Sequence, residues 1–141
     1  MALPSQAAYE RWLYGLAEAY PQIAQATLRL YSTSALTAVV EGSLHFHNGL
    51  ELRVLEVLDF KYQRFRRYSY TVYAHGEKIC WYDPQPHPEN SDLAATFPHH
   101  RHEPPDIKHN RQPAPGLSFD APNLPQVIAD CLALGEEGRG G

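Results

Sequence analysis

The fold of this chain is decided by the stretch Leu44-His45-Phe46-His47-Asn48-Gly49-Leu50-Glu51-Leu52-Arg53-Val54. Apolar and polar residues alternate on both sides of Asn48-Gly49, which is the pattern of β-strands that bury one face. Asn-Gly is a strong hairpin signal, because a type I′ turn needs a positive φ at both central residues. The alternation changes phase at Val54-Leu55, where we expect a β-bulge. The stretch predicts an antiparallel hairpin with one apolar and one polar face.

Further strands are predicted on both sides of this hairpin. Leu28 and Leu30 flank Arg29, and residues 36–46 carry the same alternation into the hairpin. Downstream, residues 68–73 and 78–82 form a second pair, joined by residues 74–77. We therefore expect a curved antiparallel meander of four to five strands.

An amphipathic helix is predicted at each end of the chain. Ser5 can cap the first helix, and Pro21 stops it. Its apolar face consists of Tyr9, Trp12, Leu13, Leu16, Ala17 and Tyr20. Asn123 can cap the second helix, with Gln126 at the third position as in a capping box, and Gly135 is expected to end it.

Both helices are expected to pack on the apolar face of the sheet. The predicted fold class is α+β, with residues 1–135 in a single domain and residues 136–141 as a flexible C-terminal tail.

Residues 83–122 differ from the rest of the chain, because they contain nine of the twelve prolines and show almost no periodicity. A loop of this length in a compact domain is usually functional or disordered. The apolar residues Phe97, Ile107, Leu117 and Phe119 favour an ordered loop, laid across the polar face of the sheet.

Composition sets limits on the function. Hydrophobic residues are 43% and charged residues 20% of the 141 residues, as in soluble globular domains. No apolar run approaches the roughly 18 residues that a membrane span needs. The net charge of −4 argues against a strongly basic nucleic-acid binder, but basic residues gather between positions 60 and 82 and permit a local anion site. Cys80 and Cys131 lie in apolar surroundings, so we expect buried free thiols and a cytoplasmic location.

Three of the eight histidines lie within Phe97-Pro98-His99-His100-Arg101-His102. Histidine is the side chain whose charge changes near neutral pH. One hypothesis is acid–base chemistry, in which one histidine acts as general base, another as general acid, and Arg101 stabilises an anionic transition state. RNA can be cleaved in this way without a metal, because its own 2′-hydroxyl is the nucleophile.

Two other interpretations of the histidines stay open. His100 and His102 flank one residue, so in an extended chain they could bind one metal together with His87 or Asp83. The spacing matches no recognised zinc motif, and we predict neither a metal nor another cofactor. Alternatively, the histidines are structural and hydrogen-bond to loop carbonyl groups.

Two further groups are candidates for the site. Tyr68 and Tyr70 lie on one strand face beside three basic residues: Arg64, Arg66 and Arg67. Aromatic platforms with adjacent guanidinium groups suit single-stranded nucleic acid, although a tyrosine-rich core face with a basic rim would show the same pattern. Asp83 ends the last predicted strand, where it could orient a histidine or simply form a turn.

These groups suggest a division of roles. We expect proton transfer by His99, His100 or His102, with Tyr70 and Asp83 as orienting groups. We expect nucleic acid to be bound by the remaining candidates, namely Arg64, Arg66, Arg67, Tyr68 and Arg101.

The order of these pieces resembles the TumE family of toxin–antitoxin proteins. Arg67-Tyr68-Ser69-Tyr70 is followed by a glycine-containing turn, then Tyr82-Asp83, a Pro/His-rich stretch, and residues 96–102. The closing helix from Leu124 to Ile128 is also similar. The resemblance implies a small cytoplasmic bacterial toxin that is neutralised by a helix-turn-helix antitoxin.

Two positions depart from the family pattern. Trp81 stands where the family tends to have an arginine, and Pro84-Gln85-Pro86-His87-Pro88 stands where it tends to have Asn-Ala-Pro-His-His-Pro.

The predicted function is therefore that of a growth-inhibiting toxin that acts on RNA or on the translation machinery, with metal-independent histidine chemistry as its mechanism. The alternative is a non-catalytic module that binds nucleic acid or protein. Besides the antitoxin, RNA and a second copy of the chain are the partners considered, and no membrane association is expected.

Overall fold

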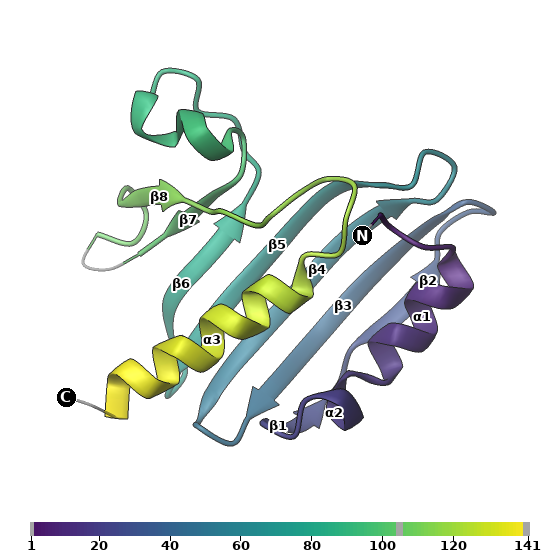
Figure 1. Cartoon of the computed structure of the whole chain (residues 1–141), viewed down its shortest axis with the longest axis horizontal. Helices are drawn as coiled ribbons and strands as arrows, with labels where there is room; N and C mark the ends of the chain where they lie inside the picture. Colours follow the sequence, from purple (N-terminus) through teal and green to yellow (C-terminus); the bar gives the residue numbers. More distant parts are fainter. Residues whose placement is uncertain (1, 104–105, 140–141) are drawn as a thin grey trace.

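The computed structural model describes residues 2–103 and 106–139. Its helices and strands follow one another along the chain as shown in Figure 1. Their bounds are α1 (Gln6–Tyr14), α2 (Leu16–Ala19), β1 (Ile23–Ala26), β2 (Arg29–Ser32), β3 (Thr37–Phe46), β4 (Leu50–Asp59), β5 (Arg64–Ala74), β6 (Glu77–Asp83), the 3₁₀ helix η1 (Ser91–Thr96), β7 (His100–His102), β8 (Arg111–Pro113) and α3 (Leu124–Arg139).

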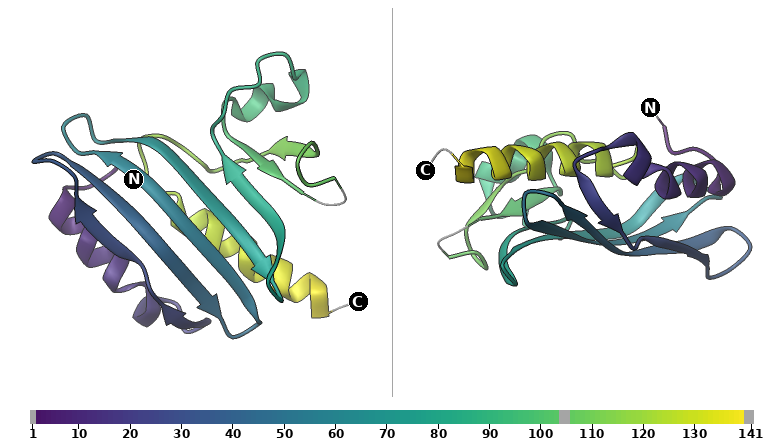
Figure 2. Two further views of the ribbon diagram at one scale, coloured as in Figure 1. Left: turned by 180° about the vertical axis from the view of Figure 1, so that it is seen from behind. Right: turned by 90° about the horizontal axis from the view of Figure 1, so that it is seen from below.

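The strands form one open antiparallel sheet of eight strands, in the order β1-β3-β4-β5-β6-β7-β8 with β2 also paired to β3. Helices α1 and α3 lie on the same face of this sheet, and no helix of the described residues covers the other face (Figure 2). The predicted α+β class is confirmed, with the helices on one face. The expected four to five strands were too few.

The central hairpin is confirmed. Strands β3 and β4 pair from Thr37↔Asp59 to His45↔Glu51, around the turn at Asn48-Gly49. The expected bulge at Val54-Leu55 was wrong, because pairing with β3 and β5 is regular there and the shift lies between Val57 and Leu58.

The apparent change of phase comes from Glu56, a charged residue at an inward position of β4. Val54, Glu56 and Leu58 all point into the core, and Glu56 is fully buried. The alternation of the backbone therefore continues, and only the residue type breaks the pattern.

The second hairpin, β5–β6, is also confirmed. His75 and Gly76 both have positive φ, at 53° and 77°, as a type I′ turn requires. Tyr70 pairs with Tyr82, and Thr71 pairs with Trp81.

The N-terminal helix starts as predicted, because the Ser5 side chain accepts a hydrogen bond from the Ala8 N–H. It is interrupted at Gly15, which separates α1 from α2. Tyr9, Leu13 and Leu16 of the predicted apolar face are buried, whereas Ala17 of that face is exposed.

The C-terminal helix differs from the prediction at both ends. The Asn123 side chain does not form a capping box: its amide donates to the Ser118 carbonyl and its oxygen accepts from the Ser118 N–H. Gln126 instead donates to Asp130. The helix continues beyond Gly135 to Arg139, so the expected helix end at Gly135 was wrong, and residues 140–141 lie outside the described residues.

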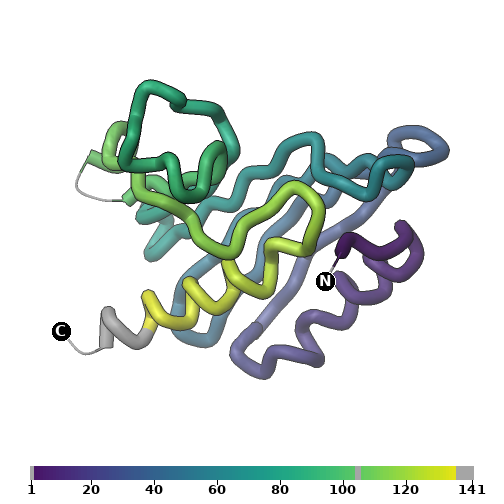
Figure 3. The backbone as a smooth tube through the Cα atoms, turned by 45° about the horizontal axis from the view of Figure 1, so that its top comes forward, coloured from purple at the N-terminus to yellow at the C-terminus, as the bar shows by residue number. Residues whose placement is uncertain are grey.

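The proline-rich segment does not lie across the sheet as a loop. It contains η1 and two short strands, β7 and β8, which extend the sheet edge beyond β6 (Figures 1 and 3). Sequence patterns do not reveal these strands, since three-residue strands carry too little alternation to be recognised.

Side chains of β5, β6 and β7 alternate between the two faces of the sheet. Tyr82 of β6 reaches α3, where its hydroxyl donates to Asp130, so its neighbour Asp83 faces the opposite way. Cys80 and Cys131 are buried free thiols, as predicted. Within the described residues, no helix has the length and apolarity needed to cross a membrane.

Candidate functional site

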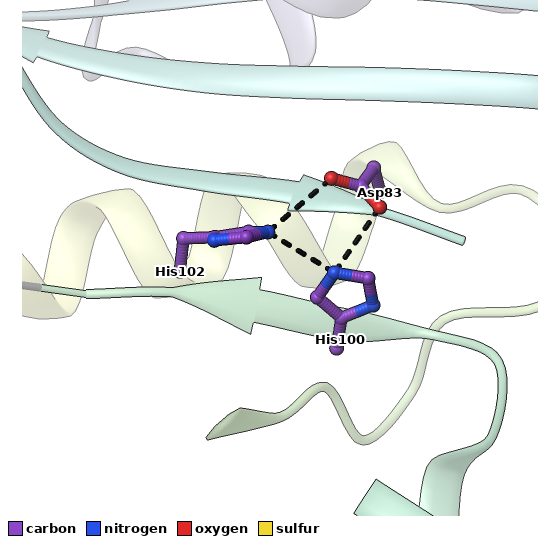
Figure 4. A group of neighbouring side chains, drawn as sticks. All are labelled: Asp83, His100 and His102. Carbon is purple, nitrogen blue, oxygen red and sulfur yellow. Dashed lines mark hydrogen bonds and ion pairs between the residues drawn. The ribbon is translucent and has the colours of Figure 1, made fainter. Parts of the chain in front are cut away.

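Three polar side chains converge where β6 pairs with β7. The register Asp83↔His100 and Trp81↔His102 places these four side chains on the same face. The Nε2 atoms of His100 and His102 lie 3.0 Å apart. The Asp83 carboxylate lies 3.1 Å from His100 Nε2 and 3.4 Å from His102 Nε2, so the three groups form a triangle (Figure 4). We call this group the Asp83 centre.

The outer ring nitrogens fix the tautomers of both histidines. His100 Nδ1 lies 3.2 Å from the Pro98 carbonyl oxygen, and His102 Nδ1 lies 3.0 Å from that of Ile107. A carbonyl can only accept, so each Nδ1 must carry the proton. In the neutral imidazoles both Nε2 atoms then present lone pairs toward Asp83 and toward each other.

Asp83 has support of its own. The indole of Trp81 donates to its carboxylate at 3.1 Å, and the Gln85 N–H donates at 2.9 Å. Partial burial alone would raise the pKa of Asp83, but the hydrogen bonds that its carboxylate accepts, among them those from Gln85 and Trp81, hold this pKa below its usual value. The Asp83 carboxylate is therefore charged at neutral pH.

Both histidines of the centre are buried. His100 is 0% and His102 is 4% exposed, and the Trp81 ring stacks on His102 at 3.8 Å. The ring of His87 covers His100 from the segment after β6. Burial lowers the pKa of His100, because desolvation disfavours the imidazolium.

A cavity of about 650 Å³ opens beside the Asp83 centre. Strand β6 ends at Asp83, and its pairing with β5 begins only at Tyr70. The first part of β5, residues 64–69, therefore has no partner in β6. The cavity lies at this notch and is lined by Arg66, Arg67, Tyr68, Asp83, Pro84, Gln85, Pro86, Pro98 and Phe119. Two guanidinium groups and one carboxylate of the centre thus border the same space.

His99 lies against the cavity wall rather than in the Asp83 centre. Its ring stacks on Tyr68 and packs against Phe119, and its Nδ1 shares a hydrogen bond with the Tyr68 hydroxyl. Burial and the neighbouring His100 lower the pKa of His99. The structure therefore brings Tyr68, His99, Arg66 and Asp83 to one place.

Tyr70 does not share the face of the Asp83 centre, so it does not lie beside the histidines that it was expected to orient. It is fully buried on the helix-covered face, where its hydroxyl donates to Glu56 at 2.5 Å. The Tyr9 hydroxyl donates to the other carboxylate oxygen at 2.6 Å. Burial raises the pKa of Glu56 to about 7, although both hydroxyls lower it.

Arg101 also points away from the Asp83 centre, because it lies between His100 and His102 in the strand. Its guanidinium lies 2.5 Å from Glu103 and 3.8 Å from Asp130 of α3. Arg64 lies over the Phe119 ring and does not line the cavity.

Sequence reasoning missed Trp81, which lies beside the Asp83 centre, and the buried Glu56. Trp81, noted only as a departure from a family pattern, contacts both His102 and Asp83. The signal was present, because Trp81 and Asp83 are two residues apart in a strand and so share a face. Glu56 was hidden because a buried acid was not expected in a core position.

The Asp83 centre also fits a metal ion. Asp83, His100 and His102 can each offer one ligand atom, and these atoms lie within 4.8 Å of one another. One carboxylate and two imidazoles form a donor set suited to divalent transition metals.

Comparison with known proteins identifies the family. The family model described as toxin TumE matches residues 14–134, which include every residue of the Asp83 centre and the cavity. No curated protein and no solved structure matches the chain. Because the matched part covers most of the chain, the protein belongs to the TumE toxin family.

Proposed function

We propose that this TumE-family protein is the growth-inhibiting toxin of a toxin–antitoxin pair and that it acts on RNA at the cavity beside the Asp83 centre. The observation that carries this proposal is that Arg66, Arg67 and Asp83 line the same cavity, with Tyr68 and Phe119 in its wall. Its neutralising partner is an antitoxin, for which the family resemblance implies a helix-turn-helix protein.

The cavity suits a polynucleotide better than a small anion. Arginine pairs with phosphate oxygens through two parallel N–H donors. Aromatic rings next to such groups accept unstacked bases of single-stranded RNA. Arg66 is already paired with Asp59 at 3.2 Å, whereas Arg67 makes no ion pair with any described residue, so Arg67 is the stronger candidate for direct phosphate contact.

The reaction we propose is cleavage beside a 2′-hydroxyl. The 2′-oxygen bonds to the adjacent phosphorus, the bond from phosphorus to the 5′-oxygen breaks, and a 2′,3′-cyclic phosphate and a 5′-hydroxyl are formed. The Asp83 carboxylate, which faces the cavity, accepts the proton of the 2′-hydroxyl. His99, which packs behind Tyr68 and Phe119 of the cavity wall, is the candidate for returning a proton to the leaving oxygen.

A second candidate is a toxin that binds RNA or protein without cleaving it. The burial of His100 and His102 favours this candidate, because neither ring can touch a substrate in the present conformation. It shares the arginine-lined cavity with the first candidate but needs no chemistry at the Asp83 centre.

Growth assays in bacteria test the role of the cavity. The variant with Arg66→Gln and Arg67→Gln should lose growth inhibition, whereas Arg64→Gln should keep it, because Arg64 lies outside the cavity. Full inhibition by the double variant, at equal protein level, would contradict the proposed RNA site.

A cleavage assay separates the two candidates. The purified protein is incubated with a fluorescent single-stranded RNA and with the same sequence made of deoxynucleotides. Cleavage of the RNA alone supports the proposed reaction, since only RNA has the attacking hydroxyl. Binding of the RNA without cleavage supports the second candidate, and cleavage of both strands contradicts the proposed reaction.

A further inference from the structure

We propose that Asp83, His100 and His102 bind one divalent first-row transition-metal ion, with zinc as the reference ion. The inference deepens the proposed function, on which it rests for its biological role only. Metal binding itself is argued from the geometry of the centre.

The first argument is the arrangement of donors and acceptors. Both Nδ1 atoms are occupied by backbone carbonyls, so both Nε2 atoms of the neutral rings are acceptors. These acceptors face each other at 3.0 Å and face a carboxylate at 3.1 and 3.4 Å. Acceptors held so close repel one another unless a cation lies between them. A metal ion satisfies all three groups at once.

The second argument is size. A tetrahedral zinc ion with ligand distances of about 2.0–2.1 Å separates neighbouring ligand atoms by about 3.3 Å, and an octahedral ion of similar radius separates them by about 3.0 Å. In the Asp83 centre the two Nε2 atoms lie 3.0 Å apart, Asp83 Oδ1 lies 3.1 Å from His100 Nε2, and Asp83 Oδ2 lies 3.4 Å from His102 Nε2. Each of these pairs matches such an edge, and both carboxylate oxygens face the imidazoles. The side chains therefore need little rearrangement to hold an ion.

The third argument is the outer shell. Histidines that bind metals usually donate their other ring N–H to a carbonyl or carboxylate, which fixes the tautomer and the ring orientation. His100 and His102 both do so. The Trp81 indole stacks on His102 and donates to Asp83, so one residue orients two ligands. Such an arrangement is typical of a preorganised site.

The fourth argument is the position of the centre. Asp83 lines the cavity, while His100 and His102 are buried behind it. An ion held there lies next to the cavity that carries Arg66 and Arg67. Burial of the two histidines, which speaks against direct contact with RNA, is what a metal site needs. If the proposed cleavage is correct, it should then depend on the metal, because the Nε2 atoms hold an ion instead of a proton.

Zinc titration of the untagged full-length protein tests this inference. The protein is first treated with a chelator and dialysed, and ZnCl₂ binding is followed by isothermal titration calorimetry. We expect one ion per chain, and His102→Gln should weaken binding at least a hundredfold. The matched control is His109→Gln, because His109 also pairs with an aspartate, Asp106, at 3.2 Å but is exposed. Its affinity should equal that of the wild-type protein.

A second variant distinguishes loss of a ligand from misfolding, and a second metal reports ligation directly. Asp83→Asn keeps the size of the side chain and should also weaken zinc binding, with an unchanged circular dichroism spectrum. Co²⁺ provides a spectroscopic signature, since its visible absorption should appear in the wild-type protein and be lost in both ligand variants. Absence of binding by the wild-type protein, or equal affinity of the wild-type protein and both ligand variants, would overturn the inference.

The outcome is distinguishable from that of the proposed function. Tight zinc binding without RNA cleavage keeps the metal site and rejects the reaction. RNA cleavage that persists in chelator, together with no zinc binding, keeps the reaction and rejects the metal site.

Discussion

The carboxylates of Glu56 and Asp83, one on each face of the sheet, have different hydrogen-bonding surroundings. Glu56 on the helix-covered face receives two hydroxyl donors, from Tyr9 and Tyr70. Asp83 on the opposite face meets two imidazole nitrogens whose lone pairs point toward it. The Glu56 group is complete without any further atom, whereas the Asp83 centre needs a proton or a cation.

This difference separates a structural polar group from the candidate functional one. Both groups contain buried polar side chains, and both join residues that are distant in sequence. Burial alone therefore does not identify the site. What distinguishes the Asp83 centre is the convergence of acceptors, together with its position at the wall of a cavity lined by arginines.

The largest predicted effect is the change in the free energy of unfolding with pH that the ionisation of Glu56 causes. Its pKa is raised from 4.5 to about 7 in the folded protein. Between these two pH values, the folded state therefore keeps a proton on Glu56 that the unfolded state releases. The stabilising contribution is fully present below about pH 4.5 and is lost as the pH rises through about 7. Since one pKa unit corresponds to about 1.4 kcal/mol, the loss amounts to about 3 kcal/mol.

Urea unfolding of the wild-type protein and of Glu56→Gln across this pH range measures the effect. The difference between their free energies of unfolding should change with pH, because glutamine does not titrate. Glu51→Gln, on the opposite face of the same strand, is the control and should follow the wild-type curve. Parallel curves for the wild-type protein and Glu56→Gln would contradict the assignment.

The next effect is stabilisation of the folded protein by zinc, which should depend on the Asp83 centre and not on Glu56. A free zinc concentration a hundredfold above the dissociation constant should raise the free energy of unfolding by about 2.7 kcal/mol. The same increase is expected for Glu56→Gln, whereas His102→Gln should show at most about 0.4 kcal/mol at the same zinc concentration. Thermal or urea unfolding with and without zinc provides the measurement. An equal increase in His102→Gln would show that zinc binds elsewhere.

A smaller effect is expected when Glu56 loses one donor. Tyr70→Phe removes a hydroxyl from the buried carboxylate and should lower the free energy of unfolding by about 1–3 kcal/mol above pH 7. Tyr73→Phe is the control, since Tyr73 lies on the opposite face of the same strand under Arg53, and its loss should stay below about 0.5 kcal/mol. Similar losses in both variants would mean that the Glu56 group contributes no special stability.

The smallest effect concerns the outer shell of the Asp83 centre. Trp81→Phe keeps an aromatic ring next to His102 but removes the N–H that donates to Asp83. Zinc affinity should fall about tenfold, as calorimetry can measure. Trp12→Phe, in α1, should leave it unchanged. Unchanged affinity in Trp81→Phe would remove the indole from the proposed metal site.

Much of the fold could be predicted from the sequence, because local signals were strong. The Asn48-Gly49 turn, the alternation around it and the helix cap at Ser5 each act within a few residues. Strands β7 and β8 could not be predicted, since they are too short to show alternation and their pairing joins β6 to residues far along the chain.

The site was predicted in part. The i, i+2 spacing of His100 and His102 correctly predicted that both rings share a face, and Asp83 was among the residues considered as their partner. The same rule, applied to β5, could not show that the face of Tyr70 is the one that the helices cover. Which face is covered depends on tertiary packing, and the sequence pattern of one strand does not contain it.

The most direct test of the contrast between Glu56 and Asp83 is ¹⁵N NMR of the imidazole nitrogens of His100 and His102, with and without one equivalent of zinc. We expect both rings to keep the proton on Nδ1, and zinc to shift both Nε2 signals while that of His109 stays unchanged. If zinc leaves the Nε2 signals of His100 and His102 unchanged, or if either ring carries its proton on Nε2 alone, the Asp83 centre is not a cation site and its contrast with Glu56 fails.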